Sequence, residues 1–416
     1  MSTDPHGAPH PLPERPNLRH LKDQAKDLLK AGTATSITDA QFQIARLYGF
    51  PSWPKLKAHV DSLPEIGQLK QAIDTNDLER VKALMTRNPE LHRAPLGYGK
   101  SGPLTWVAEC RVPWEPPTAT RLAMAKWMID HGSDVRQGAD APLMRAALKG
   151  NRIPMMELLV SCGANVNAEW NGDFPIIFAP CEALDPEALE WLLDHGANPN
   201  GTGDQRNPVT RGTDSGRGTA LDYAIGTYAR SPERLSACID LLLGAGGTTR
   251  YDAPGVLAVL RRQLERLASQ LDADSALVHR RFPELDCGST GARPLLLQGA
   301  TLLHVAAEFG NAAAAALLLD RGADVNARAT VDDAGRGGQT ALFHAVTQFG
   351  DAGLPMAQFL VERGASLTVR ATLAGSYERP DDVVECTPLG YALRFQRESY
   401  SEGRTIAFLR ERGAVE

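Results

Sequence analysis

The chain carries ten histidines and two pairs of adjacent aspartates, Asp332-Asp333 and Asp381-Asp382, as candidates for acid–base or metal chemistry. A general base must lie beside its substrate, and a metal site needs several ligands at close spacing. Both aspartate pairs fall in segments that read as loops, where a solvated acidic turn is the default and a divalent-ion site a poor second. Gly335-Arg336-Gly337-Gly338 lacks the strand-to-helix setting of a phosphate loop.

Four histidines, His131, His195, His304 and His344, lie in helical patterns and need a structural interpretation first. None of the four has the H-E-x-x-H or H-x-x-x-H spacing of a zinc site, and no G-x-S-x-G elbow or Walker loop appears. His131 and His195 both occur as Asp-His-Gly at the end of an apolar helical pattern. We expect these two to cap helix carbonyls, so we predict no catalytic residues, no metal and no cofactor.

The elements that would position such groups are clearest in residues 299–330. Leu303, Ala306 and Ala307 share one helical face, and Leu317 to Leu319 form the apolar side of a second short helix. Gly310 marks a turn between them, and Gly322 stands where a left-handed C-cap belongs. The unit is therefore helix, turn, helix, loop, and two helices alone are too few to fold.

Thr301-Leu302-Leu303-His304-Val305-Ala306, followed by Gly-Ala-Asp-Val-Asn, closely resembles the ankyrin repeat with its T-P-L-H-x-A motif. The resemblance implies an all-α solenoid of paired short helices with β-hairpin-like loops, which binds partners and rarely catalyses. It also implies that His304 hydrogen-bonds across the turn between repeats. His344 is one residue out of this register, because Phe343 takes the usual site, and we expect it to be exposed.

Weaker copies of the unit recur along the chain. They start near Pro103, Pro142, Phe174, Thr219, Thr340 and Thr387, and their closing glycines are Gly132, Gly163, Gly196, Gly246, Gly364 and Gly413. Two degenerate units resemble each other, at Leu78–Arg93 and Leu264–Arg280. Because atypical repeats tend to stand at the ends of arrays, we predict two stacks, 64–250 and 251–416, which form either one solenoid or two hinged parts.

Residues 1–63 do not follow this pattern. We expect a disordered leader at 1–16 and a small helical cap module at 17–63, with helices through Leu18–Leu29, Asp39–Leu47 and a short one at Leu56–Val60. The run Y-G-F-x-S-W-P-K-L-K resembles the N-terminal module of a group of bacterial ankyrin-repeat proteins, and it implies no activity. Its aromatic residues are expected to cover the exposed face of the first repeat.

Composition restricts the classes of partner. The net charge is −6 and the pI about 6.0, which argues against nucleic acid as the main partner. No signal peptide or membrane-spanning run is visible, and six scattered cysteines form no C-x-x-C, so we expect a cytoplasmic chain that does not bind membranes. Cys287 and Cys386 fall in loops, and nothing nearby would lower the pKa of either thiol. We also expect a monomer.

Three insertions, at 201–218, 329–339 and 371–386, lengthen the loops between repeats. We expect them to project from one edge as finger loops, beside a concave groove formed by the first helices. Arginine and tyrosine suit protein interfaces, and tryptophans on the first helices could line the groove. The candidate partner-binding residues are Arg206, Arg211, Arg217, Arg328, Arg336, Tyr377, Glu378, Arg379, Trp106 and Trp170. Trp127 and Trp191 read as core residues of second helices.

The pattern therefore favours a non-catalytic module that binds an unidentified protein in its groove and with its finger loops. A rigid array would hold its side chains in place before the partner arrives, which limits the entropy lost on binding. The alternative is an enzyme or effector that uses a groove pocket, with His344 beside Asp332 or Asp333 as general base. The two hypotheses differ in whether these three residues meet in a cavity.

Overall fold

The computed structural model describes residue 12 and residues 18–109, 116–148, 150, 152–204, 216–290, 293–375 and 382–416. It divides into two compact units. Unit 1 comprises residues 1–111 and 118–137, and unit 2 comprises 112–117 and 138–416. The disordered leader expected at 1–16 lies outside the described residues except for Leu12. The expected division into a cap module and two stacks stays a prediction.

Unit 1 begins with three helices around a small core of their own: α1 (Leu18–Lys30), α2 (Ile37–Leu47) and α3 (Trp53–Asp74). Leu21, Ala25, Ile44 and Leu56 are buried in this core, because they recur at helical spacing on facing sides. Ser36 caps α2, accepting a hydrogen bond from the Asp39 backbone N–H at 3.1 Å. The helical content expected for this part of the chain is confirmed.

Two expectations for the N-terminal part were wrong. The third helix is not short, because α3 starts at Trp53, with Pro54 accepted in its first turn, and continues to Asp74 across the expected boundary at residue 63. The aromatic residues Tyr48, Phe50 and Trp53 pack against the core of α1 to α3. They therefore belong to the interior of this helical module and are not a cover for the first repeat.

The rest of unit 1 continues with α4 (Leu78–Arg87), the 3-10 turns η1 (Pro89–Arg93) and η2 (Tyr98–Lys100), α5 (Pro103–Glu109) and α6 (Ala119–Asp130). α3 packs on α4, and α5 packs on α6. The degenerate unit in this part is a helix followed by a 3-10 turn, α4 with η1. The second degenerate unit has the same form in unit 2, as α14 (Leu264–Ala273) with η3 (Ser275–His279).

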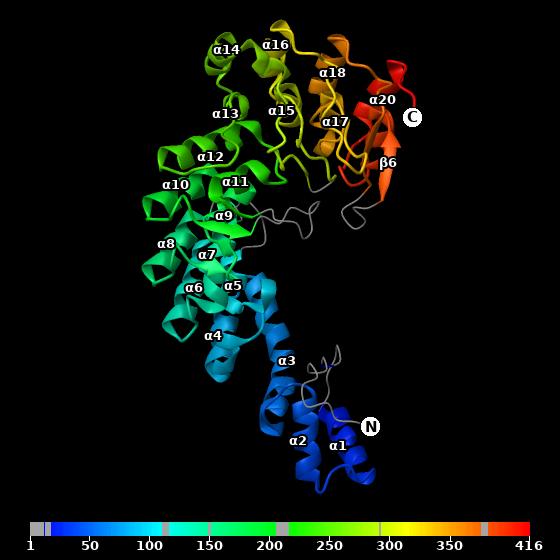
Figure 1. Cartoon of the computed structure of the whole chain (residues 1–416). Coiled ribbons are helices and arrows are strands. Elements are labelled where there is room, and N and C mark those ends of the chain that lie inside the picture. Colours follow the sequence, from blue (N-terminus) through cyan, green and yellow to red (C-terminus); the bar gives the residue numbers. More distant parts are fainter. Residues whose placement is uncertain are drawn as a thin grey trace. The chain divides into compact units, whose positions relative to one another are not determined.

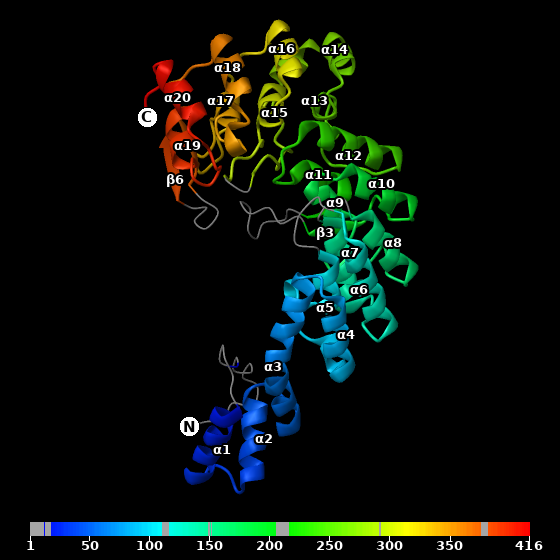
Figure 2. The same ribbon diagram turned by 180° about the vertical axis from the view of Figure 1, so that it is seen from behind.

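Unit 2 is a row of helix pairs stacked side by side (Figures 1 and 2). The first helices of the pairs contact the first helices of their neighbours, as α9 does with α11 and α15 with α17. The predicted all-α solenoid of paired helices is confirmed. The pairs are α7 (Gln137–Leu148) with α8 (Ile153–Ser161), α9 (Phe178–Ala183) with α10 (Pro186–Asp194), α11 (Ala220–Gly226) with α12 (Pro232–Gly244), α13 (Val256–Leu260) with α14, α15 (Leu302–Glu308) with α16 (Ala312–Asp320), α17 (Ala341–Ala345) with α18 (Leu354–Glu362), and α19 (Pro388–Arg394) with α20 (Arg404–Glu411).

The second helices that precede a closing glycine end as their sequence predicts. Gly322 has φ +89°, its N–H bonds to Leu319 O at 3.1 Å, and the N–H of Ala323 bonds to Leu318 O at 2.9 Å. This is the left-handed C-cap that only glycine adopts without strain. The other closing glycines also have positive φ.

Asparagines in the loops after these caps join successive repeats. Asn326 accepts from the Ser366 N–H at 2.7 Å and donates to Gly364 O at 3.1 Å. Asn167, after α8, and Asn200, after α10, make the equivalent bonds, to residues 196 and 198 and to residues 246 and 248, respectively. At these three positions a repeat is thus fixed to the next by a side chain that satisfies two backbone groups.

The long loops form two-stranded hairpins: β1 (Glu169–Trp170) with β2 (Phe174–Pro175), β3 (Thr202–Asp204) with β4 (Arg217–Thr219), and β5 (Ala371–Ala374) with β6 (Val383–Cys386). Neighbouring loops are also joined to each other. Gly337 in the 329–339 loop exchanges backbone hydrogen bonds with Thr372 of β5, at 2.7 and 3.2 Å. The predicted hairpin-like loops are therefore anchored at their bases.

Candidate interaction surface

Two of the four helical histidines are helix caps. His131 Nδ1 lies 2.8 Å from Trp127 O, and His195 Nδ1 lies 2.7 Å from Trp191 O. Each imidazole also stacks on the indole one turn earlier, with ring centroids 4.3 and 3.8 Å apart. The predicted capping role is confirmed. Trp127 and Trp191 are only half-buried, because their exposed faces serve as platforms for these rings, so assigning them to the core was wrong.

His304 binds across the turn between repeats, as its motif position predicted. Its Nδ1 accepts from the Thr301 N–H at 3.2 Å, so Nε2 carries the proton and donates to Gln339 O at 3.1 Å. Burial, together with neighbouring His344, lowers the pKa of His304 to about 3. His304 is thus a neutral structural group that connects α15 to the loop before α17.

The expectation that His344 is exposed was wrong. The side chain is fully buried, and its Nδ1 lies 2.7 Å from Glu308 Oε2. Asp332, proposed as its carboxylate partner in an enzyme, instead accepts from the Arg336 backbone N–H at 2.8 Å and the Arg336 Nε at 3.2 Å in an exposed loop. His344 points inward because its helix places it beside the last turn of α15.

Glu308 is the centre of a buried charge cluster. Its carboxylate accepts from Arg230 at 2.9 Å, from Arg293 at 2.6 Å and from His344 at 2.7 Å, with Gln348 Nε2 at 3.4 Å. Burial opposes ionisation of this carboxyl, but the two guanidinium groups lower the pKa of Glu308 to about 2. The cluster is therefore an ionised carboxylate with four donors around it.

Arg293 comes from an inserted segment whose described residues are 281–290 and 293–300, and these lie over the first helices. Arg293 is fully buried and also donates to Thr347 Oγ1 at 2.9 Å and Gly288 O at 2.8 Å. Leu295 packs with Phe343 of α17 and Tyr391 of α19 in one core cluster. The inner surface of α15, α17 and α19 is thus covered by the chain itself, so the continuous groove expected along the first helices does not extend open through this part of unit 2.

The equivalent inner surface of α9 and α11 has a different lining. Glu182 accepts hydrogen bonds from Tyr223 at 2.9 Å and from Tyr228 at 3.1 Å. Tyr223 stacks on Phe178 with ring centroids 4.5 Å apart and meets Phe174 edge-on at 5.7 Å. Burial and the Glu182 carboxylate raise the pKa of Tyr228 to about 12, so its hydroxyl remains a donor.

Glu182 and Glu308 occupy the same position in their repeats. Each lies three residues before the N-cap of a second helix, which is Asp185 for α10 and Asn311 for α16. The donors on the next helix also correspond, since Tyr223 and His344 each lie four residues after a threonine N-cap, Thr219 or Thr340. Sequence reasoning missed both glutamates, although this shared spacing was available as a signal.

Of the finger-loop candidates, three arginines are described, and all three are bonded to the protein. Arg217 donates to Thr202 Oγ1 at 3.2 Å and lies 3.6 Å from Glu169, with half of its side chain exposed. Arg328 donates to Gly338 O at 3.0 Å and Arg370 O at 2.8 Å, and Arg336 pairs with Asp332. Arg206, Arg211, Tyr377, Glu378 and Arg379 lie outside the described residues.

The two tryptophan candidates lie in different units. Trp170 on β1 meets Phe174 edge-on at 6.2 Å and so extends the aromatic row of Phe174, Phe178 and Tyr223 in unit 2. Trp106 on α5 of unit 1 donates from Nε1 to Asp74 at 2.8 Å, and Lys70 lies over its ring at 4.7 Å. Trp170 therefore contributes to an aromatic surface, whereas Trp106 is bonded to the end of α3.

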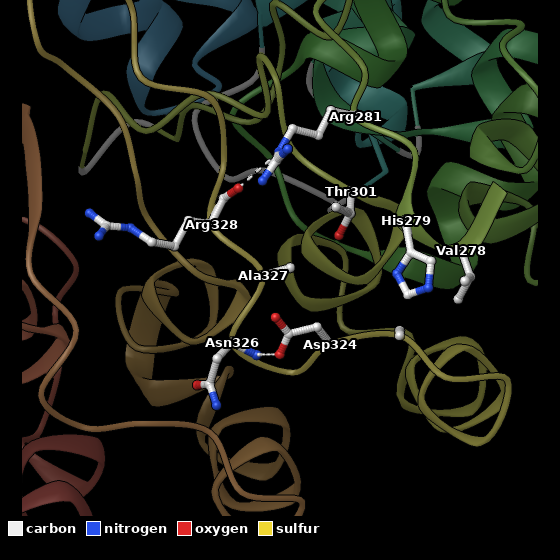
Figure 3. A pocket seen from close by; sticks show the side chains of 9 residues that line it. Val278, His279, Arg281, Thr301, Asp324, Asn326, Ala327 and Arg328 are labelled. Atoms are coloured by element: carbon white, nitrogen blue, oxygen red, sulfur yellow. Dashed lines mark hydrogen bonds between the residues drawn. The ribbon is translucent and has the colours of Figure 1, made fainter. Parts of the chain in front are cut away.

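An open pocket of about 420 Å³ lies between η3 and the loop after α16. Its lining includes His279, Arg281, Asp324 and Arg328 (Figure 3). Arg281 Nε donates to Arg328 O at 3.1 Å, and the guanidinium of Arg328 extends away from the other lining side chains. The polar groups of this pocket thus bind the loop, and they do not converge on a ligand position.

Metal and thiol chemistry gain no support from the geometry. No group of three or more histidine, cysteine, aspartate or glutamate side chains among the described residues could hold a metal ion. Cys287 and Cys386 are buried, and burial raises the thiol pKa to about 12 and about 11, respectively. In the same part of the chain, no helix has the length and apolar character needed to cross a membrane.

The helix pairs, glycine caps and hairpin loops together define an ankyrin-repeat fold. A family model described as ankyrin repeats (3 copies) matches residues 118–203 and 267–371. The chain is also similar to the crystal structure of the human ASB11 ankyrin repeat domain, with 19% sequence identity and a TM-score of 0.36, covering 72% of this chain and 98% of that chain. No curated protein sequence matches.

Proposed function

We propose that the chain is a non-catalytic module that binds another protein through the inner surface of α9 and α11 and through its finger loops. Ankyrin repeats generally mediate protein–protein interaction. The observation that carries the proposal is the aromatic row of Trp170, Phe174 and Tyr223 beside the bases of two hairpins. Aromatic side chains provide a large contact area with little loss of conformational entropy on binding.

The finger loops would complete this surface. Arg217 stands at the base of the 201–218 loop, which also carries Arg206 and Arg211, and its half-exposed guanidinium can pair with a carboxylate. On the later loops the partner would be contacted by Arg328, Arg336, Tyr377, Glu378 and Arg379, and in unit 1 it would be contacted by Trp106. Because hydrogen bonds between neighbouring loops hold their bases, binding would require little ordering of the backbone.

The enzyme alternative required His344 to meet Asp332 or Asp333 in a cavity. His344 is buried against Glu308, and Asp332 is bonded within its own loop, so the observed contacts favour the interaction module. Within that proposal, the chain acts as a monomer in the cytoplasm of a bacterium, without nucleic acid or membrane as partner. The net charge of −6 and the free thiols of five described cysteines support the absence of nucleic acid and the cytoplasmic location.

The test is a comparison of captured proteins from a lysate. The wild-type chain is compared with a variant in which Arg206, Arg211 and Arg217 are all alanine, and with Arg266→Ala as control, since Arg266 is exposed on α14. We expect mass spectrometry to find a partner that the wild type and the control retain and that the triple variant loses. The melting temperature should be the same for all three, because exposed ion pairs contribute little to stability. Equal retention by the triple variant would contradict the role of the 201–218 loop.

A further inference from the structure

The buried cluster shows what the glutamate at this repeat position binds when the chain supplies the ligand. Glu308 receives one donor from the next first helix, His344, and two guanidinium groups from elsewhere in the chain, Arg293 and Arg230. Arg293 arrives on the 281–300 insertion, which folds back on itself, since Leu297 N–H bonds to Cys287 O at 2.8 Å and Thr290 N–H bonds to Arg293 O at 3.1 Å. Within the protein, this position therefore binds arginine side chains that come from other segments of the chain.

Glu182 has the first part of this arrangement and lacks the second. Tyr223 supplies the donor from the next first helix, and Tyr228 supplies one more. A carboxylate has about four lone-pair sites, so one site on each Glu182 oxygen is left for a further donor. Among the described residues, no arginine or lysine forms an ion pair with Glu182, whose carboxylate accepts from the two tyrosines.

We propose that Glu182, Tyr223 and Tyr228 form a binding site for an arginine side chain of the partner protein. The proposal rests on the interaction module described above and names the chemistry that the α9 and α11 surface recognises. The internal segment with Arg293 occupies the corresponding position in the later repeats, and the partner segment supplies the guanidinium in the earlier ones.

Arginine suits the site better than lysine. The two remaining lone-pair sites of Glu182 lie on different oxygens, and a planar guanidinium reaches both with two parallel N–H groups. Tyr228 has 52% of its surface exposed, so its ring offers a face on which a guanidinium can stack. Arg230 already makes such a contact beside Glu308, where its guanidinium carbon lies 5.0 Å from the Phe309 ring centroid.

The test uses a fluorescein-labelled octapeptide, Ser-Thr-Gly-Ala-Arg-Pro-Leu-Leu, which is the sequence of residues 289–296. Its binding to the full-length chain is measured by fluorescence anisotropy. We expect Glu182→Gln to weaken binding at least tenfold, because the site loses its charge. The matched control is Glu190→Gln, which removes the same charge from an exposed position on α10 and should leave the affinity within a factor of two.

Changes in the peptide test the same contact without altering the protein. Replacing its arginine by citrulline keeps the shape and removes the charge, and we expect a loss as large as that of Glu182→Gln. Lysine should bind more weakly than arginine.

The proposal is overturned if the wild-type chain does not bind the peptide, if Glu182→Gln and Glu190→Gln bind it equally, or if lysine equals arginine. If in any of these cases the capture that depends on Arg206, Arg211 and Arg217 persists, the arginine site is wrong and the interaction module stands.

Discussion

Glu182 and Glu308 occupy the same position in their repeats, but the surface around Glu308 is buried and the surface around Glu182 is not. Glu308 is fully buried under residues 281–300 and surrounded by two arginines and a histidine. Glu182 remains half-buried, and in the described part of the chain two tyrosines are the hydrogen-bond donors to its carboxylate. The difference comes from the inserted segment, and it teaches that a solenoid can convert part of its binding surface into core by covering it with its own chain.

Covering the surface around Glu308 costs hydration free energy, and the uncovered surface around Glu182 does not have this cost. A buried ion pair gives up the hydration of both groups, so it is stable only when every donor and acceptor is satisfied. Arg293 meets this condition, with bonds from Nε, Nη1 and Nη2 to Thr347, Gly288 and Glu308. Glu182 needs no such enclosure, because water can reach it.

The largest expected effect follows from removing the charge at each position. Glu308→Gln leaves Arg293 and Arg230 buried without an anion, and we expect the free energy of unfolding to fall by about 3–5 kcal/mol. Glu182→Gln keeps one acceptor oxygen and puts an NH2 group in place of the other, from which a tyrosine hydroxyl can accept, and at this half-buried site we expect a loss below about 1 kcal/mol. Urea denaturation followed by circular dichroism measures both. Equal losses would show that the two positions do not differ as described.

We expect acid to lower the free energy of unfolding because His304, beside the Glu308 cluster, is buried in its neutral form. Its pKa is about 3 in the folded chain, while the unfolded histidine binds a proton below its ordinary value of 6.5. The contribution to stability is therefore complete above pH 6.5 and is lost as the pH falls towards 3, by up to about 1.4 kcal/mol per pH unit. A His304→Gln variant should lose less additional stability between pH 6.5 and 5 than the wild type does. Parallel curves for the two proteins would refute this assignment.

The repeat fold was predictable because its signals are local. Thr301, His304 and Gly322 each hold a cap or turn that involves neighbouring residues, and the structure places them as the motif indicates. The hairpin loops and the capping histidines were predicted for the same reason. Such groups interact within one repeat or with the next, where the spacing along the chain determines which atoms meet.

The Glu308 cluster was not predictable from local pattern. Arg230 and Glu308 are 78 residues apart, and nothing in the sequence near Arg293 indicates that it crosses the first helices. His344 seemed exposed because its register shifts by one residue, whereas that shift places it against Glu308. The start of α3 was placed at Leu56 instead of Trp53, although a proline such as Pro54 is well accepted in the first turn of a helix.

The smallest expected effect concerns the tyrosine donors that distinguish the Glu182 region. Burial and Glu182 raise the pKa of Tyr228 to about 12, whereas an unfolded tyrosine ionises near 10. Its contribution to stability is therefore complete below pH 10 and is lost as the pH rises through 12. Tyr228→Phe removes one half-exposed hydrogen bond, so we expect a loss of about 0.5–1 kcal/mol at pH 7 and a smaller further loss above pH 10 than in the wild type. Thermal unfolding at pH 7 and at pH 11 measures both terms, with the exposed Tyr400→Phe as the matched control. If Tyr228→Phe and Tyr400→Phe respond alike to alkali, the Tyr228 hydroxyl does not depend on Glu182, and the correspondence with the His344 and Glu308 pair fails at that point.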